Sequence, residues 1–495
     1  MTPVPTLPFD NSYSELPAQF YTAQIPTPVS EPGLVRINRE VAQLLDIDPE
    51  WLESKAGIEI LAGNQLPQGA NPIAQVYAGH QFGGWNPQLG DGRAVLLGEL
   101  VGRDGLRYDL ALKGSGPTAY SRGGDGRAPL GPVLREYIVS EAMAALNIPT
   151  TRALAAVSSG DTVMREQALP GGVLTRVAQS HIRFGTFQFF WAQQDTKALH
   201  LLLDHVICRH YPEAAQADQP GLATLEMVVA KQARLIAQWQ AAGFIHGVMN
   251  TDNMLLSGET IDYGPCAFMD HFNVDTVFSS IDRQGRYAYR NQPSIAHWNL
   301  AALAQALLPV ISSDSNKSVE QAQEVINTFP DLFREAHLKC MSAKLGIAAP
   351  SAEDEVLLSD LLELMSREQV DFTLTFRRLS ELACAQETTP SEISGVYRLP
   401  QCFDPWLARW RARLALEPMA TGECQALMYS VNPVYIPRNH LVEEAIKATI
   451  TDRDYAPFHQ LVETLASPFT YNPQRERYAA PPKPEQVVNE TFCGT

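Results

Sequence analysis

The chain has 495 residues, which is enough for a large hydrophobic core and, from length alone, for about two to four domains. Its 55 acidic and 38 basic residues give a formal net charge of −17, which argues against a nucleic-acid partner because nucleic acids bind basic surfaces. The seven cysteines are far apart and include no Cys-x-x-Cys pair, which excludes a disulfide-rich scaffold and a zinc finger and favours a cytoplasmic location.

The N-terminal segment does not look like a signal peptide, because it has neither a basic start nor a continuous apolar stretch. Residues 2–31 are rich in proline and predict an extended arm laid over the rest of the protein. The longest apolar run, residues 301–311, contains Gln305 and Pro309 and falls short of the ~20 residues that span a bilayer. We therefore expect a soluble protein without membrane contact.

A β-hairpin is predicted over residues 94–113. Residues 94–100 form a strand-like apolar run, residues 102–105 supply a glycine-containing turn, and residues 106–113 return as a second strand that ends in Lys113. Alternation along the second strand puts Lys113 on the same face as Asp109 and the small Ala111. Lys113 therefore has room for a ligand beside it.

Glycine-rich segments surround this hairpin, since residues 79–131 hold 14 of the 32 glycines. The segments 90–93 and 123–127 can bring backbone N–H groups close to a phosphate, with an arginine beside them. Two ordinary reverse turns are the alternative. Neither segment matches Gly-x-x-x-x-Gly-Lys-Ser/Thr, which excludes a P-loop.

A helix is predicted from Pro132 to a stop at residues 147–149. It carries Glu136, whose carboxylate would face Lys113 and fix the ammonium group. The alternative is an ordinary surface lysine and a solvated helix carboxylate. Glu141 lies about 140° further round a regular helix, so we do not expect it to serve the same face as Glu136.

A second helix is predicted between about residues 223 and 243, and a loop with kinase-like spacing follows it. The catalytic loop of protein kinases reads His-Arg-Asp, four residues, then Asn. Here His246-Gly247 leads into Val248, and Asn253 stands five residues later. A valine cannot accept a proton, so ordinary kinase chemistry has lost its base, and Asp252 is the nearest replacement.

The tripeptide Asp262-Tyr263-Gly264 completes this pattern. With Asn253 and Asp252 it offers carboxylate and amide oxygens, which suit Mg²⁺ that is shared with phosphates. A loop of turn-forming residues is the alternative for each part alone, but the common register with His246 favours a nucleotide and metal site.

The remainder to about residue 470 is predicted to be mostly helical, with breaks at Pro309, Pro330, Pro350, Pro390 and Pro405. The segment from Ser467 is again proline-rich and is expected to be loosely ordered.

Several of these motifs closely resemble the selenoprotein O (YdiU) family of enzymes with a pseudokinase fold. They are the runs 77–83, 110–116, 246–253 and 262–265, and the resemblance covers nearly the whole chain. It implies an α+β, two-lobed protein-kinase-like fold, with a β-rich N-lobe at 1–190 and a mostly helical C-lobe at 191–470 that carries the catalytic and metal loops and extra C-terminal helices. Residues 471–495 would form a flexible tail with Cys493.

The resemblance implies protein adenylylation: ATP binds in a flipped orientation, AMP passes to a Ser, Thr or Tyr hydroxyl of a protein, and pyrophosphate leaves. UTP is a second candidate donor, and the cofactor is Mg²⁺ or Mn²⁺. Asp252 would accept the hydroxyl proton, or else orient metal-bound water, Asn253 and Asp262 would bind the metal, and Glu136 would pair with Lys113. The nucleotide-binding residues implied are Gly90, Gly92, Arg93, Lys113, Asp125, Gly126, Arg176, Arg183 and Asp262.

Arg176 and Arg183 discriminate best between phosphate transfer and AMP transfer. In an ordinary kinase they would lie near the adenine pocket, whereas in a flipped nucleotide that pocket holds the terminal phosphates, which guanidinium groups bind well. Salt bridges with nearby acids are the alternative.

Two other functions stay open at this point. One is a true kinase for a protein or small molecule with Asp252 as a displaced base, and the other is a pseudokinase that binds nucleotide only as a scaffold. Cys493 near the end of the chain is a candidate redox switch.

Overall fold

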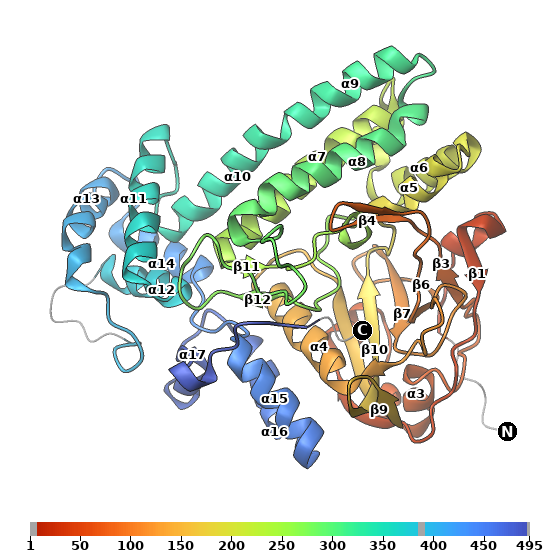
Figure 1. Ribbon diagram of the computed structural model, residues 1–495. Helices are drawn as coiled ribbons and strands as arrows, with labels where there is room; N and C mark the ends of the chain where they lie inside the picture. Colours follow the sequence, from red (N-terminus) through yellow and green to blue (C-terminus); the bar gives the residue numbers. More distant parts are fainter. Residues whose placement is uncertain (1–6, 385–391, 493–495) are drawn as a thin grey trace.

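The computed structural model describes residues 7–384 and 392–492 of the chain (Figure 1). It is a mixed α and β structure, as predicted, with the main sheet in the first 178 residues and helices dominating the rest. Cys493, the predicted redox residue, lies outside the described residues.

The main sheet has eight strands, and its neighbouring strands pair in antiparallel fashion. Its spatial order is β1 (Tyr21–Ala23), β3 (Ile73–Gln75), β6 (Ala94–Val101), β7 (Arg107–Lys113), β10 (Ala168–Ala178), β9 (Arg152–Met164) and β2 (Gly33–Ile37), with β8 (Ala128–Pro129) beside β10. Since β1 belongs to the N-terminal arm, part of the predicted extended arm adds a strand to the edge of the sheet.

The predicted hairpin is present as β6 and β7. Gly105 takes a left-handed conformation in its turn (φ 79°), and the Gly102 N–H donates to Leu106 O at 2.8 Å. Lys113, the last residue of β7, pairs with Ala94 of β6 on one side and Leu174 of β10 on the other. The lysine therefore stands in the middle of the sheet.

The two faces of the sheet are covered differently. Leu110 and Leu112 pack on the side of the short helices α1 (Arg39–Leu44), α2 (Pro49–Glu53) and α3 (Lys55–Leu61). Leu174 packs on the other side, against α4 (Leu130–Ala145). As the predicted alternation requires, Lys113 lies on the α4 side, where it meets Glu136.

Helix α4 starts two residues before the predicted Pro132 and is followed by Asn147 in a left-handed conformation (φ 61°). Its outer side is covered by α15 (Asn439–Asp452) and α16 (Ala456–Leu465), which lie beside it in Figure 1. Arg135 of α4 donates to Asn439 Oδ1 at 2.6 Å and to Glu443 Oε1 at 2.9 Å. The helix that carries Glu136 is thus held between the sheet and a late segment of the chain.

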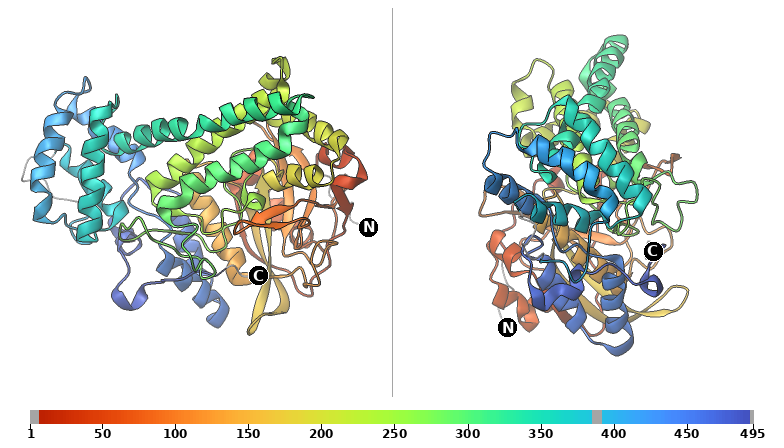
Figure 2. Two further views of the ribbon diagram at one scale, coloured as in Figure 1. Left: turned by 45° about the horizontal axis from the view of Figure 1, so that its top comes forward. Right: turned by 90° about the vertical axis from the view of Figure 1, so that its left-hand side faces the viewer.

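The remaining helices form two groups, and Figure 2 shows the second group at the end of the molecule away from the sheet. The first consists of α5 (Phe184–Ala192), α6 (Thr196–His210), α7 (Pro220–Ala242), α8 (Gln292–Ile311), α9 (Ser315–Asn327) and α10 (Phe329–Lys344). The second consists of α11 (Ala352–Glu368), α12 (Phe372–Leu382), α13 (Asp404–Leu414) and α14 (Thr421–Val431). Two short antiparallel pairs of strands complete the fold. β11 (Phe244–Ile245) and β12 (Ala267–Phe268) lie within the segment between α7 and α8, and the hairpin of β4 (Gly79–Gln81) and β5 (Gly84–Asn86) contacts residues 251–253 of the same segment.

The proline breaks follow the prediction at three of the five positions. Pro330 and Pro405 lie in the first turns of α10 and α13, and Pro350 precedes α11. The predicted break at Pro309 is wrong, because Pro309 lies inside α8; the helix nevertheless ends two residues later, so only its last residues follow the proline. Pro390 lies outside the described residues.

The C-terminal segment differs from the loosely ordered tail that its prolines suggested. It contains the short helix α17 (Glu476–Ala479), in which Tyr478 and Ala479 are buried. Thr491 is also buried, and its hydroxyl donates to Pro265 O at 2.6 Å. Contacts with residues that are distant in the sequence, such as Pro265, therefore hold the part of this segment that the structure describes.

One helical stretch within the described residues, Tyr289–Ile311, is long and apolar enough to cross a membrane. Half of it is buried inside the protein, where α8 packs against α5, α7 and α9. This burial is consistent with the core helix of a soluble protein.

Arg438 is a buried cross-link whose loss we expect to destabilise the protein. Its side chain is fully buried, Nη1 lies 2.8 Å from Asp371 Oδ2 and also contacts Asp270, and Nε donates to Ala479 O at 3.0 Å. Arg438→Met leaves the carboxylates without their cation and should cost about 3–5 kcal/mol in the free energy of unfolding, measured by chemical denaturation. The matched change Arg477→Met, in an exposed pair with Glu444, should cost at most about 1 kcal/mol; equal losses would contradict this role.

Lys344 is a buried cation that we expect to make stability depend on pH. Its Nζ lies 4.5 Å from the centre of the Phe376 ring, and burial lowers the pKa of the ammonium group from 10.5 to about 7. Between about pH 7 and 10 the unfolded chain binds this proton more strongly than the folded chain, so this group makes the fold more stable as the pH rises. Lys344→Met should therefore stabilise the protein at pH 7, and its advantage in thermal midpoint should shrink by pH 9; an advantage independent of pH would contradict this reasoning.

Candidate active site

Five predicted site residues meet in one buried cluster of charges. Lys113 Nζ lies 2.6 Å from Glu136 Oε2 and 2.8 Å from Asp262 Oδ1. Arg176 Nε donates to Glu136 Oε1 at 2.8 Å, and its Nη2 lies 2.6 Å from Asp262 Oδ1. Arg183 Nη1 lies 2.8 Å from Asp262 Oδ2. Three cations thus surround two carboxylates, which leaves the cluster with an excess of positive charge.

The cations keep both carboxylates ionised. Burial alone would raise the pKa of Asp262, but Arg176, Lys113 and Arg183 hold it well below its ordinary value. Burial also opposes ionisation of Glu136, whose pKa is nevertheless lowered by Arg176 and Lys113. Asp262 therefore carries a negative charge, which its three cationic partners share.

The loop that carries Asp262 is held in an uncommon conformation. Asp262 is left-handed (φ 62°), a conformation that is uncommon for residues other than glycine. His246 supports the loop from beneath, because its Nε2 lies 2.8 Å from Ile261 O while its ring stacks on Trp239 at 5.3 Å. The predicted catalytic-loop histidine thus positions the Asp262 loop.

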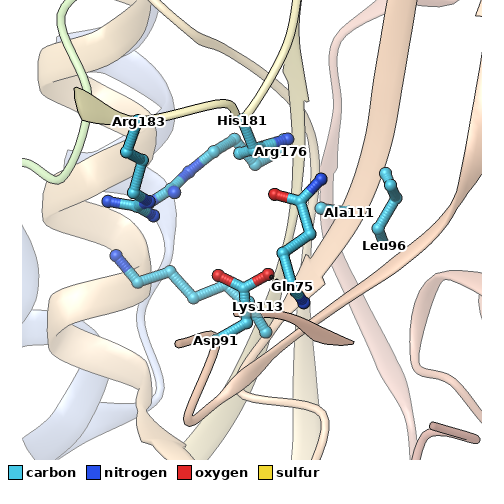
Figure 3. A pocket seen from close by; sticks show the side chains of 9 residues that line it. Gln75, Asp91, Leu96, Ala111, Lys113, Arg176, His181 and Arg183 are labelled. Atoms are coloured by element: carbon cyan, nitrogen blue, oxygen red, sulfur yellow. Dashed lines mark hydrogen bonds between the residues drawn. The ribbon is translucent and has the colours of Figure 1, made fainter. Parts of the chain in front are cut away.

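A small pocket shares Lys113, Arg176 and Arg183 with the charge cluster, and Figure 3 shows the side chains that line it. Lys113, Arg176 and Arg183 supply its cationic lining, and Ala94, Leu96 and Ala111 supply apolar walls. Gln75, Asp91 and His181 complete it, although the sequence did not single them out as site residues. The three cationic side chains of this lining suit an anionic group.

Asp252 lies beneath the β4–β5 hairpin. Its Oδ2 accepts a hydrogen bond from Gln81 Nε2 at 3.1 Å, and its Oδ1 is buried without a hydrogen-bond partner in the part of the chain that the structure describes. A Cβ added at Gly79 would lie 2.6 Å from that Oδ1, so the hairpin needs glycine here. Burial raises the pKa of Asp252 to about 6, against the opposing charge of Arg183. Such a carboxylate can exchange a proton near neutral pH.

Asn253 follows directly, and its Nδ2 donates to Val248 O at 2.9 Å. Among residues 7–384 and 392–492, no group of three or more His, Cys, Asp or Glu could hold a metal ion by itself. The Asn253 amide oxygen, the Asp262 carboxylate and the unpartnered Asp252 Oδ1 are hard donors of the kind that Mg²⁺ and Mn²⁺ accept, with phosphates as the remaining ligands. These residues therefore fit a divalent ion bound together with a nucleotide.

The two predicted glycine-rich segments, 90–93 and 123–127, supply only Asp91 to the lining of the pocket. Gly90 is left-handed (φ 102°) and lies against the Tyr120 ring, where a Cβ would come within 2.5 Å. Gly92 approaches the Tyr120 carbonyl in the same way, and Arg93 O accepts from Gly114 N at 2.7 Å. This segment borders the pocket, since its Asp91 and the following Ala94 line it.

Asp125 and Gly126 do not line this pocket. Asp125 Oδ2 lies 2.8 Å from Arg165 Nη1, and this pairing lowers its pKa. Gly126 is left-handed (φ 62°) and packs so closely on Gly116 that a Cβ would come within 2.0 Å of its carbonyl oxygen. In this structure both residues shape the loop between β7 and β8.

Comparison with known proteins shows the family of the chain. The family model described as "Protein adenylyltransferase SelO" matches residues 3–466. The chain is 58% identical over 491 residues to "Protein nucleotidyltransferase YdiU" of Rhodopseudomonas palustris (strain BisB5), and the match covers 99% of each chain. It is 56% identical over 488 residues to the protein of the same name from Bradyrhizobium diazoefficiens, again with 99% of each chain covered.

Proposed function

Because this chain belongs to the SelO family, and is therefore an enzyme of the protein nucleotidyltransferase class, we propose that it transfers AMP from ATP to Ser, Thr or Tyr hydroxyls of proteins and releases pyrophosphate. We propose further that the sheet with α4 and the helical remainder correspond to the two lobes of a kinase-like fold, divided near residue 190. The helices α15 and α16 would then belong by sequence to the second lobe, although they pack on α4 of the first lobe.

The observation that carries the proposal is the cationic pocket lined by Lys113, Arg176 and Arg183. Three fixed cations suit the two terminal phosphates, which carry most of the negative charge of ATP. Where those phosphates form the leaving group, the cations stabilise the charge that develops on pyrophosphate. Val248 supports the same conclusion, since the position of the kinase base holds a side chain that cannot accept a proton.

In the proposed reaction, Asp252, Asn253, Asp262 and Glu136 each have a distinct role. The oxygen of the protein hydroxyl attacks the α-phosphorus, the bond from that phosphorus to the bridging oxygen of pyrophosphate breaks, and Asp252 receives the hydroxyl proton. Asn253 and Asp262 would hold Mg²⁺ or Mn²⁺, which neutralises charge on the phosphates when bound. Glu136 keeps Lys113 in place.

We propose nucleotide contacts for Gly90, Gly92, Arg93, Asp125 and Gly126 as well. The first three border the pocket, whereas Asp125 and Gly126 would contribute through the loop that they shape. UTP remains a second proposed donor, with transfer of UMP by the same steps.

The test is to incubate the protein with a protein mixture and ATP labelled at either the α or the γ phosphate, with Mg²⁺ and separately with Mn²⁺. Label should enter protein from the α position only, and competition with unlabelled UTP should measure the preference for the base. Label from the γ position would make the protein a kinase. Binding of ATP without transfer from either position would support a scaffold.

A further inference from the structure

His181 is a buried residue of the pocket that the proposed mechanism does not use. It lies in the short segment between β10 and α5 and is 5% exposed. It shares the lining of the pocket with Lys113, Arg176 and Arg183, and Figure 3 shows it beside Arg176. Its position therefore brings an imidazole to the place where three cations already gather.

Asp109 of β7 fixes the orientation of this imidazole. Asp109 Oδ2 accepts from the His181 backbone N–H at 2.8 Å and lies 2.9 Å from His181 Nδ1. An ionised carboxylate can only accept hydrogen bonds, so Nδ1 carries a proton. The other ring nitrogen, Nε2, is buried and has no hydrogen-bond partner among the described residues.

Asp109 is itself held in place. Its Oδ1 lies 2.5 Å from Arg209 Nη2, and Arg209 also lies 3.2 Å from Glu99 Oε2. Burial would raise the pKa of Asp109, but Arg209 and His181 hold it below its ordinary value. The carboxylate therefore stays ionised and can balance a positive charge on the imidazole.

A buried ring nitrogen without a partner is uncommon, and a missing ligand is one explanation. We propose that His181 Nε2 donates a hydrogen bond to an oxygen of the terminal phosphates of the donor nucleotide, with Asp109 as the positioning residue. The identity of the ligand rests on the proposed function, whereas the geometry of the two side chains does not.

The donating form of His181 is the imidazolium ion, because Nδ1 and Nε2 must both carry protons. Asp109 supplies a carboxylate beside Nδ1 that balances the charge of this form. The charged groups that face the ring or lie directly behind it are Asp91, Asp109, Glu99, Lys113, Arg176, Arg183 and Arg209, and the three cations of the pocket pair with Glu136 and Asp262. A bound phosphate would add negative charge on the side of the ring that faces the pocket.

The consequence is selectivity for the triphosphate. A contact to the terminal phosphates contributes to binding ATP and pyrophosphate but not AMP. Two variants separate the ring nitrogens: His181→Asn keeps an amide near Asp109 and removes the donor in the pocket, while His181→Gln can place an amide N–H near the position of Nε2.

The experiment measures the dissociation constants of ATP with Mg²⁺, of pyrophosphate with Mg²⁺ and of AMP by titration calorimetry on the full chain. His181→Asn should weaken binding of ATP and pyrophosphate about ten- to one-hundredfold and leave AMP unchanged, and His181→Gln should recover part of the loss. Asp109→Asn should also weaken ATP binding selectively. Equal weakening of ATP and AMP, or no change in either, would overturn the proposal.

His205→Asn is the matched control, because His205 is another histidine whose Nε2 is buried without a partner among the described residues, but it does not line the pocket. It should leave the ratio of ATP to AMP affinity unchanged, and a matching change in that ratio would overturn the role of His181. If no AMP transfer is found while the selectivity depends on His181, the proposed function fails and the phosphate contact stands. If AMP is transferred while the selectivity is unchanged in His181→Asn, the phosphate contact fails and the proposed function stands.

Discussion

Replacing Asp262 with asparagine is expected to lower AMP transfer by about a thousandfold or more. The substitution keeps the size of the side chain but removes the charge that Lys113, Arg176 and Arg183 share. It also removes the proposed carboxylate ligand of the metal, on which charge neutralisation at the phosphates depends. The measurement is the initial rate of transfer of α-labelled AMP at saturating ATP and metal.

Asp275→Asn is a suitable control for this change, because Asp275 pairs with a single arginine, Arg290, and both side chains are more than half exposed. It should leave transfer unchanged. Thermal denaturation of both variants distinguishes a loss of catalysis from a loss of folded protein. Asp262→Asn should lower the thermal midpoint, because it leaves the charges of three buried cations with one carboxylate fewer to balance them. A folded Asp262→Asn protein that keeps most of its activity would remove Asp262 from the proposed mechanism.

Replacing Asp252 with asparagine is the second change with a large expected effect, about 10²–10⁴-fold on the rate of transfer. Asparagine can keep the contact with Gln81 but cannot take a proton from the attacking hydroxyl. Because Asp252 is proposed to act on the acceptor and not on the phosphates in the pocket, the affinity for ATP should change little. The paired measurement is therefore the transfer rate and the dissociation constant of ATP for the same preparation.

Glu259→Gln supplies the comparison for Asp252, since Glu259 is also a buried carboxylate whose pKa burial raises, to about 7. It hydrogen-bonds to Ser257 and to the Gln179 N–H, outside the pocket lining, and its replacement should not affect the rate. If excess metal restores the Asp252→Asn rate, Asp252 orients a metal ligand and is not the base. An unaffected rate would mean that another group accepts the proton.

The sequence predicted the parts of the site that depend on local pattern. Alternation along residues 106–113 places Lys113 opposite the apolar face of its strand, and helical spacing brings Glu136 rather than Glu141 toward it; both features are present. Glu141 instead pairs with Arg152 at 2.8 Å. Periodicity fixes which face a side chain occupies once the element is identified, and this is why these residues could be named.

Contacts between distant segments were beyond the same reasoning. Nothing in the local pattern links His181 to Asp109, 72 residues earlier, or Gln81 to Asp252, 171 residues later. His181 lies between Arg176 and Arg183 in the sequence, which weakly suggested that it belongs to the same site. Its pairing with Asp109 depends on which strands lie side by side in the sheet, and the local pattern does not reveal this. The cover of α4 by α15 and α16 is likewise a tertiary contact that helical periodicity cannot specify.

The packing of α4 also bears on the biosynthesis of the protein. All strands of the main sheet have been synthesised by residue 178, and N-terminal parts of a chain generally fold first on the ribosome. The apolar side of α4 that meets Phe458 and Leu461 stays uncovered, however, until residues more than 300 positions later leave the ribosome. The helix that holds Glu136 against Lys113 gains its final support only near the end of translation, so a nascent or truncated chain would have an incomplete nucleotide site and an exposed apolar surface for chaperones to recognise.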